Sequence, residues 1–315
     1  MSAVDEEAAD DTMLCCASCG KAAGGNINLK ICTACKLVRY CSVDCQKKHR
    51  PQHKKACKKR AAELCDDRLF TQPEESHLGE CPICCLPLPL DPDKSKLNTC
   101  CGKRICIGCD YANKNRELDQ GLEERCPYCR EPMPDTEEGN QNYIMKRAEV
   151  NDPAAIFQTG QKCDDEGDYK KAVQYWKKAA QLGDMNAHYN LSLMYQKGEG
   201  VEKDKKKEIY HMEEAAIGGH PWARINLGAY EWNSGRYDRA VKHYIIAAKA
   251  GYDMGLDRVK QCFANGIVSK EVFEAALREH QAAVDATKSK QREEAYVFNN
   301  LSLEEQIRWL QSLGH

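Results

Sequence analysis

The stretches CASCGK (16–21) and LKICTACKLVRYCSVDCQKKHRPQHKKAC (29–57) decide how the first part of this chain folds. Cysteine and histidine recur in them at the spacings that metal ions require, and a hydrophobic core needs no such spacing. Eight of the nine cysteines and histidines in these stretches have such spacings: Cys16, Cys19, Cys32, Cys35, Cys41, Cys45, His53 and Cys57. Because a structural zinc ion takes four such donors in a tetrahedron, the two stretches predict two zinc ions.

A second cysteine cluster lies between Cys81 and Cys129, and neither cluster is long enough to fold by itself. Below roughly 70 residues, a hydrophobic core seldom supplies more than ~5 kcal/mol of stability. A structural zinc ion supplies roughly 10–16 kcal/mol in finger peptides. We therefore expect metal, rather than apolar burial, to organise residues 1–135, with four zinc ions in all.

Length and composition set broad limits on the class of protein. The 315 residues allow two or three domains, and the net charge of -2 points to neither nucleic acid nor a membrane surface. No apolar run is long enough for a transmembrane helix, and the acidic start (1–13) lacks the apolar core of a secretory signal, so we expect a disordered tail there. Eighteen of the twenty cysteines precede residue 130. We expect a cytoplasmic or nuclear protein, in which reduced thiols bind metal.

The first cluster resembles the MYND zinc finger, because all eight ligand positions and the pair Tyr40–Cys41 occur in the family's order. The resemblance implies interleaved ligation. One ion is expected on Cys16, Cys19, Cys41 and Cys45, and the other on Cys32, Cys35, His53 and Cys57. Cys15 has the wrong spacing for a knuckle. His49 remains an alternative to His53, although Pro51 is expected to break the helix between the two histidines.

MYND fingers bind peptides of partner proteins, and the resemblance implies a peptide-binding role here too. Gln46 matches one typical contact residue of the family, but Arg50 stands where a tryptophan is usual. The basic run 47–60 is expected to be the solvated face of the finger's helices, so we do not expect nucleic acid as a partner.

The second cluster reads ECPICC (80–85), NTCCGKRICIGC (98–109) and RCPYCR (125–130). It resembles an all-cysteine RING-type zinc finger, since Lys103 stands where most RING fingers have a histidine ligand. The resemblance implies a cross-brace. One ion is expected on Cys81, Cys84, Cys106 and Cys109, and the other on Cys100, Cys101, Cys126 and Cys129. Cys85 remains an alternative to Cys100 or Cys101.

A RING finger forms no covalent intermediate but holds a ubiquitin-conjugating enzyme that carries ubiquitin. By resemblance, the contacts to the conjugating enzyme are Ile83, Pro127 and Arg130, and Arg130 also contacts ubiquitin through its forked guanidinium. No catalytic residue is expected on this chain. The hypothesis is a ubiquitin-protein ligase whose other modules select protein substrates. The alternative is a non-catalytic scaffold that only binds proteins.

The second half of the chain repeats with a period of about 34 residues, which is typical of stacked helix pairs. Phase marks are KKAAQLGD (177–184), EEAAIGGH (213–220) and IIAAKAGY (245–252), and they resemble Sel-like, tetratricopeptide-type repeats. Such units stack into a superhelix with a concave face for a peptide or protein. After it, Ser302 and Glu305 predict a capping box, and Leu303, Ile307 and Leu310 predict one apolar helix face.

The sequence thus predicts a multidomain fold with two small zinc-stabilised α+β modules followed by an all-α helical-repeat solenoid. The expected boundaries are 1–13 for the tail, 14–58 for the MYND-type finger, 59–78 for a linker, 79–135 for the RING-type finger, 136–152 for a second linker, 153–284 for the repeats and 285–315 for the C-terminal amphipathic helical segment.

Overall fold

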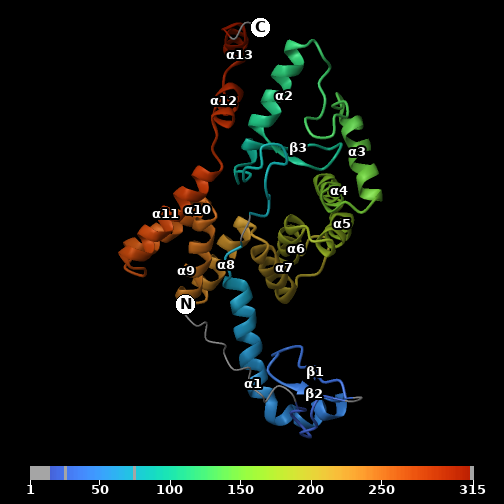
Figure 1. The fold of residues 1–315 in the computed structure, drawn as a ribbon, viewed down its shortest axis with the longest axis vertical. Helices are drawn as coiled ribbons and strands as arrows, with labels where there is room; N and C mark the ends of the chain where they lie inside the picture. Colours follow the sequence, from blue (N-terminus) through green and yellow to red (C-terminus); the bar gives the residue numbers. More distant parts are fainter. Residues whose placement is uncertain (1–14, 25–26, 74–75, 313–315) are drawn as a thin grey trace, which may run out of the picture. The chain divides into compact units, whose positions relative to one another are not determined.

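A computed structural model describes residues 15–24, 27–73 and 76–312 of the chain. The chain divides into two units, Met1–Thr71 and Gln72–His315, and each is described by itself (Figure 1). The expected acidic tail lies outside the described residues. Among the described helices, none combines the length and the apolar character needed to cross a membrane.

The first unit contains a short hairpin and one long helix. Strands β1 (Lys30–Ile31) and β2 (Arg39–Tyr40) pair antiparallel, with Lys30 opposite Tyr40. Helix α1 (Val43–Phe70) follows directly, and its N-cap Ser42 accepts a hydrogen bond from the Cys45 N–H at 3.2 Å. Because the small core of this unit consists mainly of its cysteines with Leu29 and Tyr40, apolar burial is slight.

Helix α1 corrects two sequence expectations. Pro51 lies inside it rather than ending it, and the helix continues through Phe70 over residues expected to form a linker. A proline removes one helical hydrogen bond and often bends a helix without ending it, and Figure 1 shows α1 with a bend. Metal ligands on both sides of Pro51 explain why the helical path is kept, since they fix its two halves to the same module.

The second unit begins with the other cysteine-rich module. A 3-10 turn (Pro92–Lys94) leads into β3 (Ser95–Leu97), which pairs antiparallel with β4 (Arg104–Cys106). Helix α2 (Ile107–Asp119) follows, and Cys106 is its N-cap. The expected linker 136–152 is largely a helix, α3 (Glu137–Glu149), which Thr136 caps. The segment therefore continues into the repeats as ordered structure.

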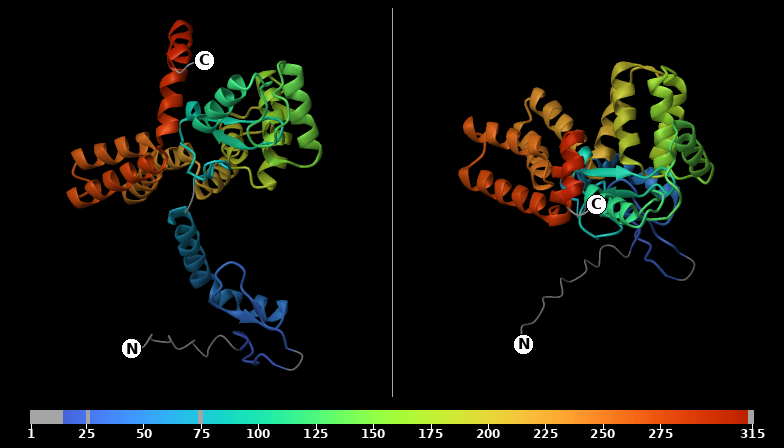
Figure 2. Two further views of the ribbon diagram at one scale, coloured as in Figure 1. Left: turned by 45° about the horizontal axis from the view of Figure 1, so that its top comes forward. Right: turned by 90° about the horizontal axis from the view of Figure 1, so that it is seen from above.

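Eight helices follow one another from residue 153 to residue 286, and consecutive helices pack against each other (Figure 2). They are α4 (Pro153–Asp165), α5 (Tyr169–Gln181), α6 (Met185–Lys197), α7 (Lys205–Ile217), α8 (Pro221–Asn233), α9 (Tyr237–Lys249), α10 (Asp253–Ala264) and α11 (Lys270–Ala286). Aspartates cap several of them: the carboxylates of Asp152, Asp168, Asp184 and Asp204 accept backbone N–H groups of the first turn.

Close approach within a helix pair depends on small residues of its first helix. A Cβ at Gly160 would lie 2.5 Å from the Trp176 ring, and a Cβ at Gly228 would lie 2.3 Å from the Tyr244 ring. Trp176 and Tyr244 are buried in two separate apolar clusters of the repeats. These clusters give the solenoid a core that is formed by apolar burial and does not depend on metal.

The aromatic residues of the repeats differ in burial. Tyr195 is buried like Trp176 and Tyr244, whereas Trp222 is 45% exposed and Tyr175 is also exposed. Of the two cysteines in this half of the chain, Cys262 is buried and Cys163 is half-buried.

Two helices follow the repeats, α12 (Lys290–Asn299) and α13 (Leu303–Ser312). The capping box forms, since Ser302 Oγ and N–H both donate to Glu305 Oε2 and the Glu305 N–H donates to Ser302 Oγ at 3.4 Å. The expected apolar face of Leu303, Ile307 and Leu310 involves side chains outside the described residues. Helix α12 lies against α2 of the cysteine-rich module.

Candidate metal centres

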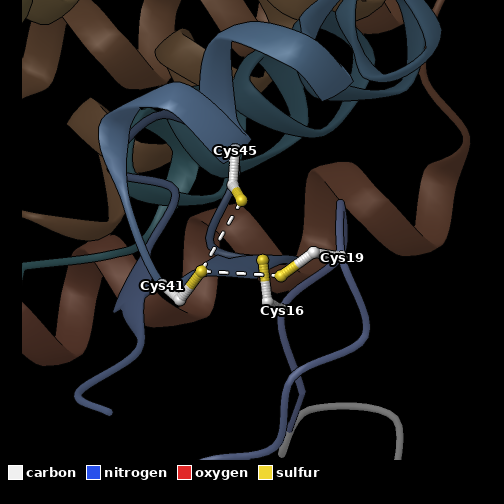
Figure 3. A group of neighbouring side chains, drawn as sticks. All are labelled: Cys16, Cys19, Cys41 and Cys45. Carbon is white, nitrogen blue, oxygen red and sulfur yellow. Dashed lines mark hydrogen bonds between the residues drawn. The ribbon is translucent and has the colours of Figure 1, made fainter. Parts of the chain in front are cut away.

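Four sulfur atoms converge in the first unit from three parts of the chain. Cys16 and Cys19 come from the first loop, Cys41 follows β2, and Cys45 lies in the first turn of α1 (Figure 3). Their Sγ atoms lie 3.6 Å apart for Cys19 and Cys41 and 3.5 Å apart for Cys41 and Cys45. In a tetrahedral site with Zn–S bonds of ~2.3 Å, neighbouring sulfurs are about 3.8 Å apart. The observed spacing therefore suits a zinc ion.

The second donor set of this unit consists of Cys32, Cys35, His53 and Cys57. Cys35 Sγ lies 3.2 Å from His53 Nε2, and the sulfurs of Cys32 and Cys57 are 3.8 Å apart. His49 belongs to no donor group among the described residues. Its ring stacks on that of His53 at 5.6 Å, and its Nδ1 lies 3.0 Å from the Tyr40 hydroxyl. His49 thus orients the ring of the ligand His53 without belonging to the donor set.

The cysteine-rich module of the second unit also gathers two groups. The first consists of Cys81, Cys84, Cys106 and Cys109, and the second of Cys100, Cys101, Cys126 and Cys129. Sulfur–sulfur distances are 3.8 Å for Cys84 and Cys106, 3.8 Å for Cys101 and Cys126, and 3.4 Å for Cys100 and Cys129. The two groups alternate along the chain, which is a cross-brace. Cys85 lies outside both and is exposed.

One backbone turn is repeated in four of the five C-x-x-C motifs, the exception being Cys106–Cys109 at the start of α2. The N–H of the residue after the second cysteine donates to the carbonyl of the first, and that residue has a positive φ. These residues are Gly20 (φ 71), Lys36 (φ 55), Cys85 (φ 55) and Arg130 (φ 64). The turn explains why Cys85 is not a ligand: it occupies the left-handed position that closes the turn, and its side chain points elsewhere.

The same turn prepares the first cysteine of each motif to bind metal. Burial alone would raise the pKa of the Cys16 thiol, but hydrogen bonds from backbone N–H groups, first that of Cys41 and then those of Ser18 and Cys19 in the turn, lower it to about 6. A hydrogen bond from the Cys106 thiol, with help from backbone N–H groups, lowers the pKa of Cys81 to about 4. Since the thiolate is the form that binds zinc, these hydrogen bonds favour metal loading at both positions.

Sequence reasoning missed a fifth turn of this kind. The Gly102 N–H donates to the Asn98 carbonyl at 2.8 Å, and Gly102 has a φ of 66°. Asn98 thus occupies the place of a first cysteine, and Cys101 that of a second. The signal was present as Asn98-x-x-Cys101-Gly102, which parallels Cys16-x-x-Cys19-Gly20. This turn lets two adjacent cysteines serve one site, and Lys103 lies outside it with its Nζ 5.9 Å from the centroid of the Tyr128 ring.

The three side chains expected to contact a conjugating enzyme have different surroundings. Ile83 is 42% exposed and Pro127 is half-buried. Arg130 folds back onto α2, where Nη1 donates to Asn113 Oδ1 and Nη2 to Glu117 Oε1, both at 2.7 Å. Glu117 is buried. Sequence analysis did not identify Asn113 and Glu117, because nothing in a helix sequence marks which polar residue faces inward.

The donor sets fit zinc in number and kind. Each set has four thiolate or imidazole donors that all lie within 4.8 Å of one another. All-sulfur and mixed sulfur–nitrogen tetrahedra are the usual surroundings of structural zinc. Four sites fit four ions, as the sequence predicts.

Comparison with protein-family models matches residues 16–57 to the MYND finger. The first cysteine-rich module is a MYND finger. A second family, the Sel1 repeat, matches residues 154–184, 186–220 and 226–252. The first of these matches covers both α4 and α5 apart from Pro153, so this helix pair is a complete repeat unit. Neither match extends over residues 79–135, where the RING-type resemblance rests on motif and geometry.

Solved structures with similarity to this chain include other repeat proteins. The Sel1 repeat protein from Oxalobacter formigenes is 21% identical, with a TM-score of 0.39, and the match covers 56% of this chain and 72% of that protein. The uropathogenic Escherichia coli antigen c5321, described as having an SLR fold, is 21% identical, with a TM-score of 0.37, covering 62% and 40%. A comparison with curated proteins gave no match. A MYND finger and Sel1 repeats in one chain make a zinc-finger and repeat protein suited to protein–protein interaction.

Proposed function

We propose that residues 79–135 act as a RING-type finger and that the chain is a ubiquitin-protein ligase. The observation that carries the proposal is the cross-brace, in which two four-cysteine groups alternate along one short module. Two shared zinc sites fix the loops around residues 81–84 and 126–129 at a set distance from α2. A rigid surface built from two such loops and a helix is what a docking site for a conjugating enzyme requires.

The proposed chemistry needs no nucleophile on this chain. A conjugating enzyme would bring ubiquitin as a thioester, and docking would hold that thioester in a pose open to attack by a substrate lysine. Ile83 suits the contact, since it is an exposed apolar side chain between two zinc ligands. Pro127 occupies the equivalent place in the last motif.

Substrate choice is assigned to the MYND finger and the Sel1 repeats. The exposed Trp222, which forms an edge contact with Tyr252 at 5.6 Å, offers the repeats an aromatic anchor for a bound protein. We also propose that the protein works in the cytoplasm or nucleus, where its sixteen ligands stay reduced.

Autoubiquitination by the purified full chain tests the proposal. With activating enzyme, ATP, ubiquitin and a panel of conjugating enzymes, we expect ubiquitin chains, and Ile83→Ala should suppress them roughly 10-fold or more. Loss of a buried isoleucine contact costs about 1.5–3 kcal/mol, which is roughly 10–100-fold in affinity. Ile267→Ala is the matched control, because Ile267 is exposed to a similar degree in a repeat turn.

A non-catalytic scaffold is the second candidate, and the surroundings of Arg130 favour it. The guanidinium that a ligase would direct toward ubiquitin is bound to Asn113 and Glu117 instead. A ligase would have to release it on docking. If zinc-loaded wild-type chain forms no ubiquitin chains with any conjugating enzyme of the panel, the scaffold is the function.

A further inference from the structure

Helix α12 places one arginine against Cys84, a zinc ligand that lies 208 residues earlier in the sequence. Arg292 is 6% exposed, and its Nη2 donates to Cys84 Sγ at 3.2 Å and to the Leu86 carbonyl at 3.1 Å. Its Nη1 donates to the carbonyls of Pro87 and Thr287, each at 2.7 Å. One side chain therefore joins a metal ligand, the loop that follows it and the C-terminal end of α11.

The charges of the two groups are complementary. A zinc ion bound by four thiolates carries a net charge of about −2. A buried site of this charge is stabilised by a cation and by N–H donors to sulfur, and a guanidinium supplies both in a fixed fork. Donation to Cys84 also draws electron density from that sulfur, which makes it less reactive toward acids and oxidants.

The position of Arg292 is fixed by the packing of α12 on α2. A Cβ at Gly108 would lie 3.0 Å from the Cα, Cγ and N atoms of Arg292, so a side chain at this position would push the two helices slightly apart. Farther along, the Phe298 and Tyr111 rings are 4.9 Å apart, and the Nζ of Lys94 lies 4.8 Å from the centroid of the Tyr296 ring. Contacts at both ends of α12 hold the guanidinium on the sulfur.

We propose that Arg292 is an outer-shell residue of the zinc site formed by Cys81, Cys84, Cys106 and Cys109, and that the C-terminal helix α12 is an integral part of this zinc module. The module then extends beyond residues 79–135. Its metal retention depends on a helix encoded near the other end of the chain. This inference concerns the metal site and is independent of ligase activity.

Zinc release from the full chain, measured with a chromophoric chelator in excess, tests the proposal. Removal of an outer-shell partner typically weakens metal binding roughly 10–100-fold. In Arg292→Ala we therefore expect one of the four ions to leave at least about 10-fold faster than in the wild type, and the other three at unchanged rates. Arg292→Lys keeps the positive charge but loses the forked pair of donors, so its rate of zinc release should lie between the rates of the wild type and of Arg292→Ala.

Two further variants separate the proposal from a general loss of stability. Phe298→Ala loosens α12 without touching Arg292 or a ligand, and should accelerate release of the same ion by a smaller factor. Arg278→Ala, at an exposed position of α11, is the control and should release all four ions as the wild type does.

Site assignment comes from mass spectrometry after alkylation, which identifies the cysteines that become reactive first. Early labelling at Cys81, Cys84, Cys106 and Cys109 in Arg292→Ala supports the proposal. Wild-type kinetics in Arg292→Ala would overturn it, and so would equal acceleration at all four sites, because the arginine would then act on global stability only.

Discussion

At the scale of single residues, the buried carboxylate of Glu117 organises the polar side of α2. Glu117 is 2% exposed. It accepts hydrogen bonds from the Arg125 N–H at 3.1 Å, from Asn113 Nδ2 at 2.9 Å and from Arg130 Nη2 at 2.7 Å. A carboxylate that is buried to this extent needs such partners. Without them, the free-energy cost of removing its charge from water exceeds the electrostatic stabilisation that it gains inside the protein. The network joins α2 to the last cysteine motif.

Arg130→Ala should therefore destabilise the second unit even if Arg130 contacts no other protein. A hydrogen bond to a charged group contributes roughly 1.5–3 kcal/mol, and we expect a loss of that size in the chelator-sensitive unfolding transition. Glu117→Gln in the same chain should recover part of the loss, since the buried charge is removed with its partner.

A double-mutant cycle measures this coupling, with Arg278→Ala as the exposed control. Strictly additive losses would contradict the network. An unchanged transition in Arg130→Ala would leave Arg130 free to serve a partner, as the ligase proposal requires.

Single functional residues can be predicted from the sequence where the chemistry of the site requires a particular residue type. Sixteen donor positions follow from spacing and resemblance, and they lie together in four groups. The choice of Cys100 and Cys101 over Cys85 did not follow from spacing. It depends on a left-handed φ of 55°, which a non-glycine residue adopts here to close the turn. The roles of Arg292 and Glu117 depend on tertiary contacts that no local pattern encodes.

At the scale of elements, the helices were easier to predict than their ends. The pairs of the repeat region follow from their period, whereas α1 passes through a proline and α3 fills a segment rich in acidic and turn residues. The segment that contains α3 was predicted to be a linker because acidic and turn-forming residues are common in it. Thr136 nevertheless starts a helix there by accepting the Gly139 N–H of the first turn.

The start of α8 carries a pH-dependent cap. His220 is the N-cap, its Nδ1 accepts the Ala223 N–H at 3.3 Å, and its ring stacks on Tyr189 at 4.4 Å. The His77 ring lies 5.0 Å away. Burial lowers the pKa of His220 to about 3 and that of His77 to about 4. Both rings are therefore neutral in the folded chain near pH 7.

The sign of the pH effect follows from these lowered pKa values. An unfolded histidine has a pKa of about 6.5, so between about pH 6.5 and pH 4 the unfolded chain binds more protons than the folded chain. Stability from the neutral pair is complete above about pH 6.5 and is lost as the pH falls through that window, by up to about 1.4 kcal/mol per pH unit for each proton.

We expect His220→Asn to show a weaker dependence of stability on pH between 6.5 and 5 than the wild type. Asparagine keeps a side-chain acceptor at the N-cap but does not titrate. Protonation of zinc ligands affects the wild type and His220→Asn alike, so the difference between their thermal midpoints reports the contribution of the histidine alone. Parallel midpoint curves for the two chains would show that the buried pair does not control this response.

At the scale of the whole molecule, two kinds of stabilisation act in one chain. The repeats bury apolar side chains in two clusters around Trp176 and Tyr244. The MYND finger buries mainly its own cysteines, with only Leu69 buried on the whole of α1. In the second unit, the cysteine-rich module contacts α3, the helix that leads into the repeats, through Arg147, whose Nη1 donates to the Thr99 carbonyl at 3.1 Å. Metal should therefore control some segments and not others.

Exhaustive chelation under reducing conditions should unfold the chain in part. Hydrogen exchange read by mass spectrometry should show lost protection over residues 16–57 and 81–129, while α5, α6, α8 and α9 keep theirs, because their core contains no metal. Helix α12 should lose protection together with the second cysteine module, since its buried arginine would lose the zinc-bound sulfur that it contacts. Full protection of the cysteine-rich segments after complete metal removal would contradict a metal-organised N-terminal half, whereas collapse of the repeats as well would show that their apolar core is insufficient alone.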